Sequence, residues 1–311
     1  VLGFVEGWRG IIEGTTMPLD WKTTDDKISE GGTMLGSSRT NPFRRENGVE
    51  MLKENFGKFE LDALVVIGGD DTLGVANRLY HEHELPTVGC PKTIDNDLSA
   101  TDFTFGYDTA INIAMESIDK LITTARSHRR VIVVEIMGRH AGWIAAGAGI
   151  AAGADVTLVP EKPFSLDRIC ETLKRNRERG KLYNIVAVAE GAKLGGGEDF
   201  HTQDEGVDEF GHIRLGGIGK ALAKEIEDRT GYESRHVVLG HLQRGGHPSA
   251  FDRVLGTRVG IKAFETLKAG EYGKMIALKG SEVVAVPLED GVGKLKLLSK
   301  DYMKVLDTFE Q

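Results

Sequence analysis

The sequence predicts an α/β fold with two doubly wound, mostly parallel-sheet domains. Short β-branched segments alternate along the chain with amphipathic helical segments, and this alternation is typical of crossover connections between parallel strands. The strand segments are almost continuously apolar, which indicates strands that are buried on both faces. The chain has 311 residues, which is enough for two domains of about 150 residues each.

The expected strands and helices follow one another along most of the chain. Strands are predicted over residues 61–67, 131–136, 156–159, 185–189, 237–239 and 283–286. Helices are predicted over residues 109–125, 166–179, 218–229 and 250–267. Residues 198–209 are acidic and follow three glycines, which predicts a surface loop. Ligands of open parallel sheets bind beyond the carboxyl ends of the strands, so we expect chemistry in the loops after residues 61–67, 131–136 and 184–190.

Composition and charge exclude several classes of protein. Lys and Arg number 39 against 47 Asp and Glu, a net charge of −8 that provides no basic field for nucleic acid. No apolar run approaches the roughly 20 residues that a membrane helix needs, so we expect no membrane partner. The cysteines, Cys90 and Cys170, are far apart and form no CxxC pattern, which favours a protein of the reducing cytoplasm. The 40 glycines exceed ordinary usage and indicate backbone that approaches a ligand closely.

The first predicted strand is followed by residues 68–72, Gly-Gly-Asp-Asp-Thr, and a helical pattern begins at once. The two glycines would let a phosphate approach the backbone, and the free N–H groups of a helix N-terminus would bind it. Asp70 is a candidate ligand for Mg²⁺, an ion that prefers carboxylate, water and phosphate oxygens. A turn with an aspartate cap explains the same five residues equally well.

A second loop carries residues 91–97, Pro-Lys-Thr-Ile-Asp-Asn-Asp. Its lysine, its threonine hydroxyl and the carboxylates of Asp95 and Asp97 could together neutralise a phosphoryl group and accept a proton from an alcohol. The same residue types also occur in ordinary turns. Two further loops, residues 137–143 (MGRHAGW) and 239–246 (LGHLQRGG), follow other predicted strands.

Taken in order, these loops resemble those of the phosphofructokinase family. The resemblance includes residues 7–10 (GWRG), 36–39 (GSSR), 68–72, 91–97, 137–143, 189–191 (AEG), 241–246 and 249–253 (SAFDR). It covers nearly the whole chain, and four collinear motifs in the right order are specific although each alone is not. The family implies a donor domain of residues 1–106 plus 243–292 and a sugar-phosphate domain of residues 107–242 plus 293–311.

The resemblance also implies roles for individual residues in phosphoryl transfer to fructose 6-phosphate. Asp95 corresponds to the general base that takes the proton of the 1-hydroxyl, and Asp97 to a second carboxylate that assists it. Arg39 corresponds to the arginine near the transferred phosphoryl group, and Arg139 is implied to help neutralise its charge together with Mg²⁺ and Lys92. The residues that match the family's fructose 6-phosphate contacts are Thr93, Met137, Gly138, Arg139, Glu190, His241 and Arg244. Arg130 and Arg235 match arginines that reach the sugar phosphate of a neighbouring subunit, which implies a homo-oligomer, a dimer or a tetramer, with shared active sites.

Two positions indicate which phosphoryl donor the resemblance implies, because ATP-using members of the family generally carry glycine at both. This chain has Asp71 and Lys92 there. Asp71 would crowd and repel the α-phosphate of ATP, whereas Lys92 can pair with the terminal phosphate of pyrophosphate. The resemblance therefore implies a reversible, pyrophosphate-dependent enzyme of glycolysis and gluconeogenesis with Mg²⁺ as its metal. The implied donor-side residues are Arg39, Gly69, Asp71, Thr72 and Lys92, with Asp70 as the Mg²⁺ ligand.

Three alternatives stand beside this interpretation. An ATP-dependent phosphofructokinase could tolerate Asp71. A lipid or NAD kinase would share the loop of residues 68–72 but has no counterpart of residues 91–97 or 241–246. A non-catalytic regulatory subunit would be expected to lack the base or the magnesium carboxylate, and both are present. Members of the family begin with a strand and a glycine-rich phosphate loop upstream of the position that matches Val1, so we expect a chain truncated at its N-terminus.

Overall fold

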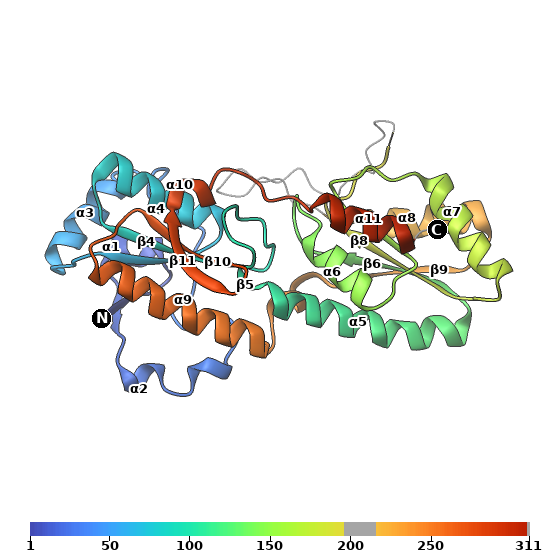
Figure 1. Cartoon of the computed structure of the whole chain (residues 1–311), viewed down its shortest axis with the longest axis horizontal. Helices are drawn as coiled ribbons and strands as arrows, with labels where there is room; N and C mark the ends of the chain where they lie inside the picture. The colour runs from blue at the N-terminus through green and yellow to red at the C-terminus, as the bar shows by residue number, and fades with distance from the viewer. Residues whose placement is uncertain (196–215, 310–311) are drawn as a thin grey trace.

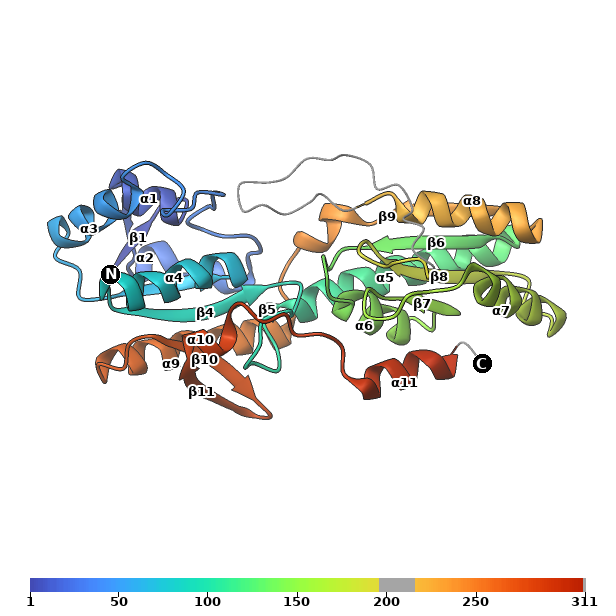
Figure 2. The ribbon, with the colours of Figure 1, turned by 90° about the horizontal axis from the view of Figure 1, so that it is seen from above.

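The computed structural model describes residues 1–195 and 216–309, which form two lobes arranged along the long axis of the molecule (Figure 1). Each lobe contains a β-sheet with helices packed against it, so the predicted α/β class is confirmed (Figure 2). The surface loop predicted for residues 198–209 lies outside the described residues. Within the described part of the chain, no helix is both long and apolar enough to span a bilayer.

The sheet of the first lobe has the strand order β11-β10-β4-β3, and β5 pairs with β4. Its strands are β3 (Leu64–Gly68), β4 (Thr87–Thr93), β5 (Phe105–Gly106), β10 (Lys274–Lys279) and β11 (Glu282–Pro287). Neighbouring strands are parallel except β10 and β11, which form an antiparallel hairpin. Helices α1 (Trp8–Glu13), α3 (Gly48–Lys58) and α4 (Asp70–His83) pack on one face of the sheet, and α9 (Ala250–Lys268) packs on the other.

One face of β3 is exposed, so the prediction of a strand buried on both faces is wrong here. Val65 is 44% exposed and Ile67 is 56% exposed, whereas Leu64 and Val66 on the opposite face are buried. The reason is the position of β3 at the edge of the sheet. Helix α9 packs on β4 and β10, and among the described residues no element covers this face of β3.

The sheet of the second lobe is entirely parallel and has the order β7-β8-β6-β9. Its strands are β6 (Val131–Ile136), β7 (Val156–Leu158), β8 (Asn184–Ala189) and β9 (Ser234–Val238). Helices α5 (Tyr107–His128), α6 (Trp143–Ala151) and α11 (Lys300–Phe309) pack on one face, and α7 (Leu166–Glu178) and α8 (Ile218–Thr230) pack on the other. Both β6 and β8 are buried along their whole length, as their apolar sequences predict. The edge strands β9 and, in the first lobe, β11 are largely exposed or half-buried, so the prediction of burial on both faces is wrong for them as well.

Several elements were not predicted. Strand β10 has the sequence KMIALK, in which one β-branched residue stands among residues that also favour helices. Helix α3 and strands β4 and β5 were not predicted either. The remaining unpredicted elements are short. They are β1 (Leu2–Phe4), β2 (Thr16–Pro18), α2 (Trp21–Thr24), the 3₁₀ helices η1 (Lys27–Ser29) and η2 (Gly240–Arg244), and α10 (Leu288–Gly291).

The lobes are joined where the N-termini of α5 and α9 meet. The Ser249 hydroxyl donates to Asp108 Oδ2 at 2.6 Å, and the backbone N–H of Thr109 donates to Asp252 Oδ2 at 2.8 Å. Each helix therefore supplies acceptors near the first turn of the other, where N–H groups have no partner within their own helix. These bonds tie the first lobe, which contains α9, to the second lobe, which contains α5.

Candidate active site

A cleft of about 1020 Å³ lies between the two lobes. It opens at the carboxyl ends of β3, β4 and β6, the place where parallel sheets bind ligands. Ten of the residues singled out from the sequence line it, and they come from loops far apart along the chain. They are Gly69, Asp70, Asp71, Thr72, Lys92, Thr93, Asp95, Asp97, Arg139 and Arg244.

The turn between β3 and α4 places two carboxylates at the cleft. Gly68 is required here because a Cβ atom on it would lie 2.5 Å from the Thr72 side chain. Helix α4 begins at Asp70, so both Asp70 and Asp71 lie in its first turn, where negative charge suits the helix dipole. The backbone N–H of Gly293 donates to Asp70 Oδ1 at 3.0 Å.

Asp95 is buried in the loop that follows β4. The residue is 6% exposed, and its Oδ1 has no hydrogen-bond partner among the described residues. Burial raises the pKa of Asp95, while the guanidinium groups of Arg244 and Arg139 act in the opposite direction. A buried carboxylate oxygen without a partner is costly, so its presence in a cleft indicates that a ligand supplies the missing donor.

Asp97 lies in the same loop and also lines the cleft. Burial raises its pKa to about 6, and the nearby negative charges of Asp95 and Asp70 add to this shift. The two carboxylates of this loop therefore repel each other when both are ionised.

Lys92 and Arg244 supply positive charge close to these carboxylates. Burial lowers the pKa of Lys92, the neighbouring Arg244 guanidinium lowers it further, and Asp95 opposes both effects. A polyanion bound in the cleft would relieve the repulsion between the two cations. The arrangement suits a phosphate or pyrophosphate group.

Glu190 shapes the loop that carries Arg139. Its Oε1 accepts hydrogen bonds from the backbone N–H groups of Gly138 at 3.2 Å and Arg139 at 2.9 Å. Arg139 has a φ of 53°, in the left-handed region that few residues other than glycine adopt, so these bonds hold a strained turn. The Glu190 carboxylate contacts the backbone of this loop, and its contact with fructose 6-phosphate stays a prediction.

Arg130 and Arg235 lie away from the cleft, near the amino ends of β6 and β9. Both pair with Glu233, at 2.7 Å for Arg130 and 2.6 Å for Arg235. Strand β6 separates Arg130 from the loop of Arg139, a length of about 20 Å at 3.3 Å per residue. Neither arginine therefore lines the cleft of its own chain. The remaining predicted residues outside the cleft lining are Arg39, Met137, Gly138, Glu190 and His241.

The cleft also contains residues that sequence reasoning missed. Asp252 and Gln243 are both buried and line the cleft. Asp252 Oδ1 and Gln243 Oε1 have no hydrogen-bond partner among the described residues. Both stand within or beside motifs of the resemblance, but nothing in the pattern distinguished them from cap and turn residues. Residues 293–295 line the cleft as well, although they lie in a C-terminal segment that carries no motif.

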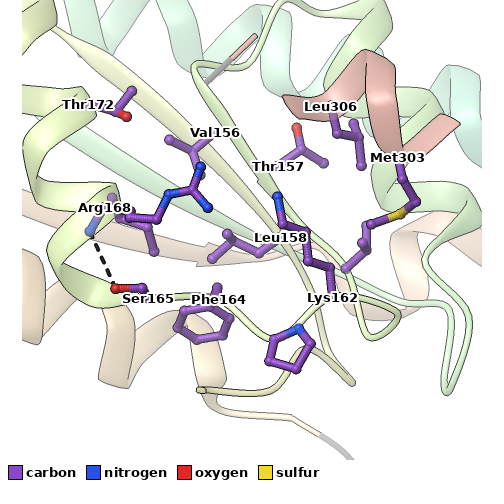
Figure 3. Close-up of a pocket in the computed structure, with 13 residues that line it drawn as sticks. Val156, Thr157, Leu158, Lys162, Phe164, Ser165, Arg168, Thr172, Met303 and Leu306 are labelled. Carbon is purple, nitrogen blue, oxygen red and sulfur yellow. Dashed lines mark hydrogen bonds between the residues drawn. The ribbon is translucent and has the colours of Figure 1, made fainter. Parts of the chain in front are cut away.

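A second, much smaller cavity of about 70 Å³ lies between β7, α7 and α11 (Figure 3). Its walls are largely apolar, with Leu158, Phe164 and Met303 among the lining residues. The Ser165 hydroxyl accepts a hydrogen bond from the backbone N–H of Arg168 at 3.5 Å, which caps α7. A cavity of this size holds only a few water molecules and cannot hold a sugar phosphate.

A cleft between two α/β lobes, with buried carboxylates close to a cluster of basic side chains, is typical of a phosphoryl-transfer enzyme. Comparison with known families identifies the class further. The model of the phosphofructokinase family matches residues 1–267. The chain belongs to the phosphofructokinase family, so the resemblance predicted from its motifs is confirmed.

Curated relatives in this family use two different donors, according to their names. The chain is 53% identical over 294 residues to the pyrophosphate–fructose 6-phosphate 1-phosphotransferase of Streptomyces coelicolor, covering 94% of this chain and 85% of that protein. It is 50% identical over 311 residues to the enzyme of the same name from Amycolatopsis methanolica, covering 99% of this chain and 90% of that one. It is also 48% identical over 299 residues to the ATP-dependent 6-phosphofructokinase of Mycobacterium leprae, covering 96% of this chain and 87% of that protein.

Solved structures agree with the family assignment. The phosphofructokinase of Saccharomyces cerevisiae superposes with a TM-score of 0.83 at 28% identity, covering 99% of this chain and 44% of that chain. The pyrophosphate-dependent phosphofructokinase of Marinobacter aquaeolei superposes with a TM-score of 0.78 at 25% identity, covering 99% of this chain and 82% of that one.

Proposed function

We propose that the chain transfers a phosphoryl group from pyrophosphate to the 1-hydroxyl of fructose 6-phosphate, giving fructose 1,6-bisphosphate and phosphate. The observation that carries this proposal is the buried Asp95 carboxylate, whose Oδ1 has no partner among the described residues. Asp95 lines the cleft together with Lys92, Arg139 and Arg244. A carboxylate in this setting can accept the proton of the attacking hydroxyl while the cations neutralise the phosphoryl group.

The donor preference rests on Asp71 and Lys92, which both line the cleft. Asp71 lies in the first turn of α4, beside the backbone N–H groups that would donate hydrogen bonds to phosphate oxygens. Its carboxylate disfavours a longer polyphosphate chain at this place by like-charge repulsion. The names of the Streptomyces and Amycolatopsis relatives support the same donor.

Mg²⁺ is the metal that the cleft would hold, with Asp70 as its protein ligand. The Asp70 carboxylate lines the cleft, and within the described residues no cluster of three metal-binding side chains occurs. This fits Mg²⁺, which keeps several waters and is often bound through one or two carboxylates plus substrate phosphates. When bound, the ion would neutralise charge on the donor oxygens.

One lobe would bind the phosphoryl donor, and the other would bind the sugar phosphate. We assign residues 1–106 plus 243–292 to the donor domain and residues 107–242 plus 293–311 to the sugar-phosphate domain. Residues 64–106 and 274–287 contribute the strands of one sheet, and residues 131–238 those of the other, which supports this assignment. Arg130 and Arg235 would serve the site of a neighbouring copy in a homo-oligomer, because neither lines the cleft of its own chain.

The cellular setting follows from the chemistry and the cysteines. Cys90 and Cys170 are both free and buried, which suits the reducing cytoplasm. Hydrolysis of pyrophosphate releases less free energy than the corresponding step with ATP, so the reaction would run in both directions, in glycolysis and in gluconeogenesis.

ATP as donor is the second candidate, because the Mycobacterium leprae relative carries that name. The two donors are distinguished by measuring fructose 1,6-bisphosphate formation with each at the same Mg²⁺ concentration. We expect kcat/KM for pyrophosphate to exceed that for ATP by at least about a hundredfold, which corresponds to ~3 kcal/mol. Equal use of both donors would overturn the donor assignment, and no turnover with either would overturn the reaction.

A further inference from the structure

The C-terminal connection between α10 and α11 runs from one lobe to the other (Figures 1 and 2). It contacts the loop of residues 94–97, which we call the catalytic loop. We call residues 293–298 the strap. The N–H of Gly293 donates to Asp70 Oδ1 at 3.0 Å, and the N–H of Lys296 donates to the Asp97 carbonyl oxygen at 2.8 Å. The N–H of Leu298 then donates to Glu161 Oε1 in the second lobe at 3.1 Å. The strap thus touches both the proposed metal ligand and the catalytic loop, although it lies outside the residues matched by the family model.

The side chain of Lys296 ends in a cage of oxygen atoms. Its Nζ donates to Asn96 Oδ1 at 3.0 Å, to the Thr101 carbonyl at 2.9 Å and to the Asp102 carbonyl at 2.9 Å. These bonds use all three donors of the ammonium group. The same nitrogen lies 5.0 Å from the centre of the Trp143 ring, so an aromatic face closes the cage.

The cage has the chemistry of a monovalent cation site. Backbone and amide carbonyl oxygens are the groups that replace the hydration shell of K⁺ in proteins. Burial lowers the pKa of Lys296 to about 8, and the negative charges of Asp102 and Asp97 oppose this shift. The lysine is therefore mostly protonated near neutral pH and supplies the positive charge itself.

Asn96 connects this cage to the catalytic carboxylates. It stands between Asp95 and Asp97, has a φ of 51° in the left-handed region, and is 1% exposed. Its Oδ1 accepts the Thr104 N–H at 3.0 Å as well as the Lys296 ammonium group. A left-handed residue other than glycine costs about 1 kcal/mol or more, so the conformation must be held by contacts of this kind. Holding Asn96 in this conformation therefore fixes the directions in which the side chains of Asp95 and Asp97 project from the loop.

We propose that Lys296 is a positioning residue whose ammonium group acts as a built-in monovalent cation, holding Asn96 so that Asp95 and Asp97 face the cleft. Lys296 does not touch the substrate in this assignment. It acts through the loop, from a position 200 residues away in the sequence. This inference rests on the proposed function, because it assigns the loop a catalytic task.

The test is chemical rescue of a cavity variant. Lys296→Ala removes the ammonium group and leaves its cage open. We expect kcat to fall by about ten- to a hundredfold, the range that a small misplacement of catalytic groups produces, with little change in KM. Added KCl or NH₄Cl should restore most of the loss, while tetramethylammonium chloride at equal ionic strength should not. Wild-type protein and the exposed-site control Lys300→Ala should show normal kcat and no specific response to K⁺ or NH₄⁺.

A second variant and a second readout separate this proposal from simple loss of stability. Lys296→Met fills the space without charge, so it should be slow and should not be rescued. The melting temperature of Lys296→Ala should rise with K⁺ or NH₄⁺ more than that of the wild type, and this measurement needs no activity. Normal kcat in the folded Met variant, or an Ala variant without cation-specific recovery of kcat or melting temperature, would overturn the proposal. Wild-type protein inactive with either donor would instead count against the proposed function.

Discussion

Arg139 Nη1 lies 3.8 Å from Asp71 Oδ2, so an ion pair joins the two lobes across the cleft. Asp71 belongs to the first turn of α4 in the first lobe, and Arg139 to the loop after β6 in the second lobe. The side chains are 28% and 37% exposed, and a pair so accessible to water contributes at most about 1 kcal/mol. An incoming phosphoryl donor can therefore replace Asp71 as the partner of Arg139 at small cost.

The first prediction concerns this pair and donor choice. Asp71→Gly should raise kcat/KM for ATP from near zero to a measurable value, because it removes both the repulsion and the bulk at the ATP α-phosphate. Lys92→Gly should mainly weaken pyrophosphate turnover, by about 2 to 5 kcal/mol, the loss expected when a buried charge partner is truncated. Both residues line one cleft, so the double variant should favour ATP more than the single variants suggest. Steady-state kinetics with both donors test this, and an Asp71→Gly protein with no gain for ATP would remove Asp71 as the selector.

A second prediction concerns the base. Asp95→Asn keeps the shape of the side chain but cannot accept the proton of the hydroxyl group, so kcat should fall by at least about a hundredfold. Binding of fructose 6-phosphate, measured by calorimetry, should persist. The exposed-site variant Asp62→Asn is the control and should keep normal kcat. Near-normal turnover of Asp95→Asn would exclude Asp95 as the base.

The shared site can be tested by mixing inactive proteins. Asp95→Ala and Arg235→Ala should each be nearly inactive, and mixed oligomers should regain activity because one interface can combine an intact Asp95 with an intact Arg235. A mixture of Asp95→Ala with Asp97→Ala is the matched control, since both changes affect the same loop and no intact site can form. If mixed oligomers form and the first mixture stays inactive, the arginines do not act across an interface.

The pKa of Asp97 leads to a prediction about stability. Because this pKa is raised from 3.8 to about 6, the folded protein holds the Asp97 proton more tightly than the unfolded chain does. The resulting stabilisation is complete below pH 3.8 and is lost as the pH rises through about 6. Asp97→Asn should therefore raise the free energy of unfolding at pH 8 by about 1 to 3 kcal/mol and change it little near pH 4. Its kcat should fall at the same time.

Urea unfolding in magnesium-free buffer at the two pH values measures this effect. Magnesium is omitted because its charge near Asp70 would stabilise the ionised form of Asp97. A variant that is less stable than the wild type at pH 8 would show that Asp97 makes a favourable contact in its ionised form.

Local sequence patterns were enough to predict the buried strands and the loops that carry the charged residues, because both depend on residues that are adjacent in the sequence. The apolar segments around residues 131–136 and 185–189 are strands because burial on both faces selects such residues. The loops of residues 68–72 and 91–97 carry carboxylates at the ends of parallel strands, and the topology of such sheets brings those ends to one edge. The family and the core of the candidate site could therefore be predicted without coordinates.

Tertiary structure decided the features that depend on partners distant in the sequence. Edge position left one face of β3 exposed, although its residues are as apolar as those of the buried strands. The pairing of Asp71 with Arg139 depends on how two lobes meet, and no periodicity encodes that distance. The bond from Lys296 to Asn96 is the clearest case. A lysine in a segment without a motif resembles any solvated lysine until the fold places it in a cage of oxygen atoms, because hydrogen bonds depend on spatial proximity and not on sequence separation.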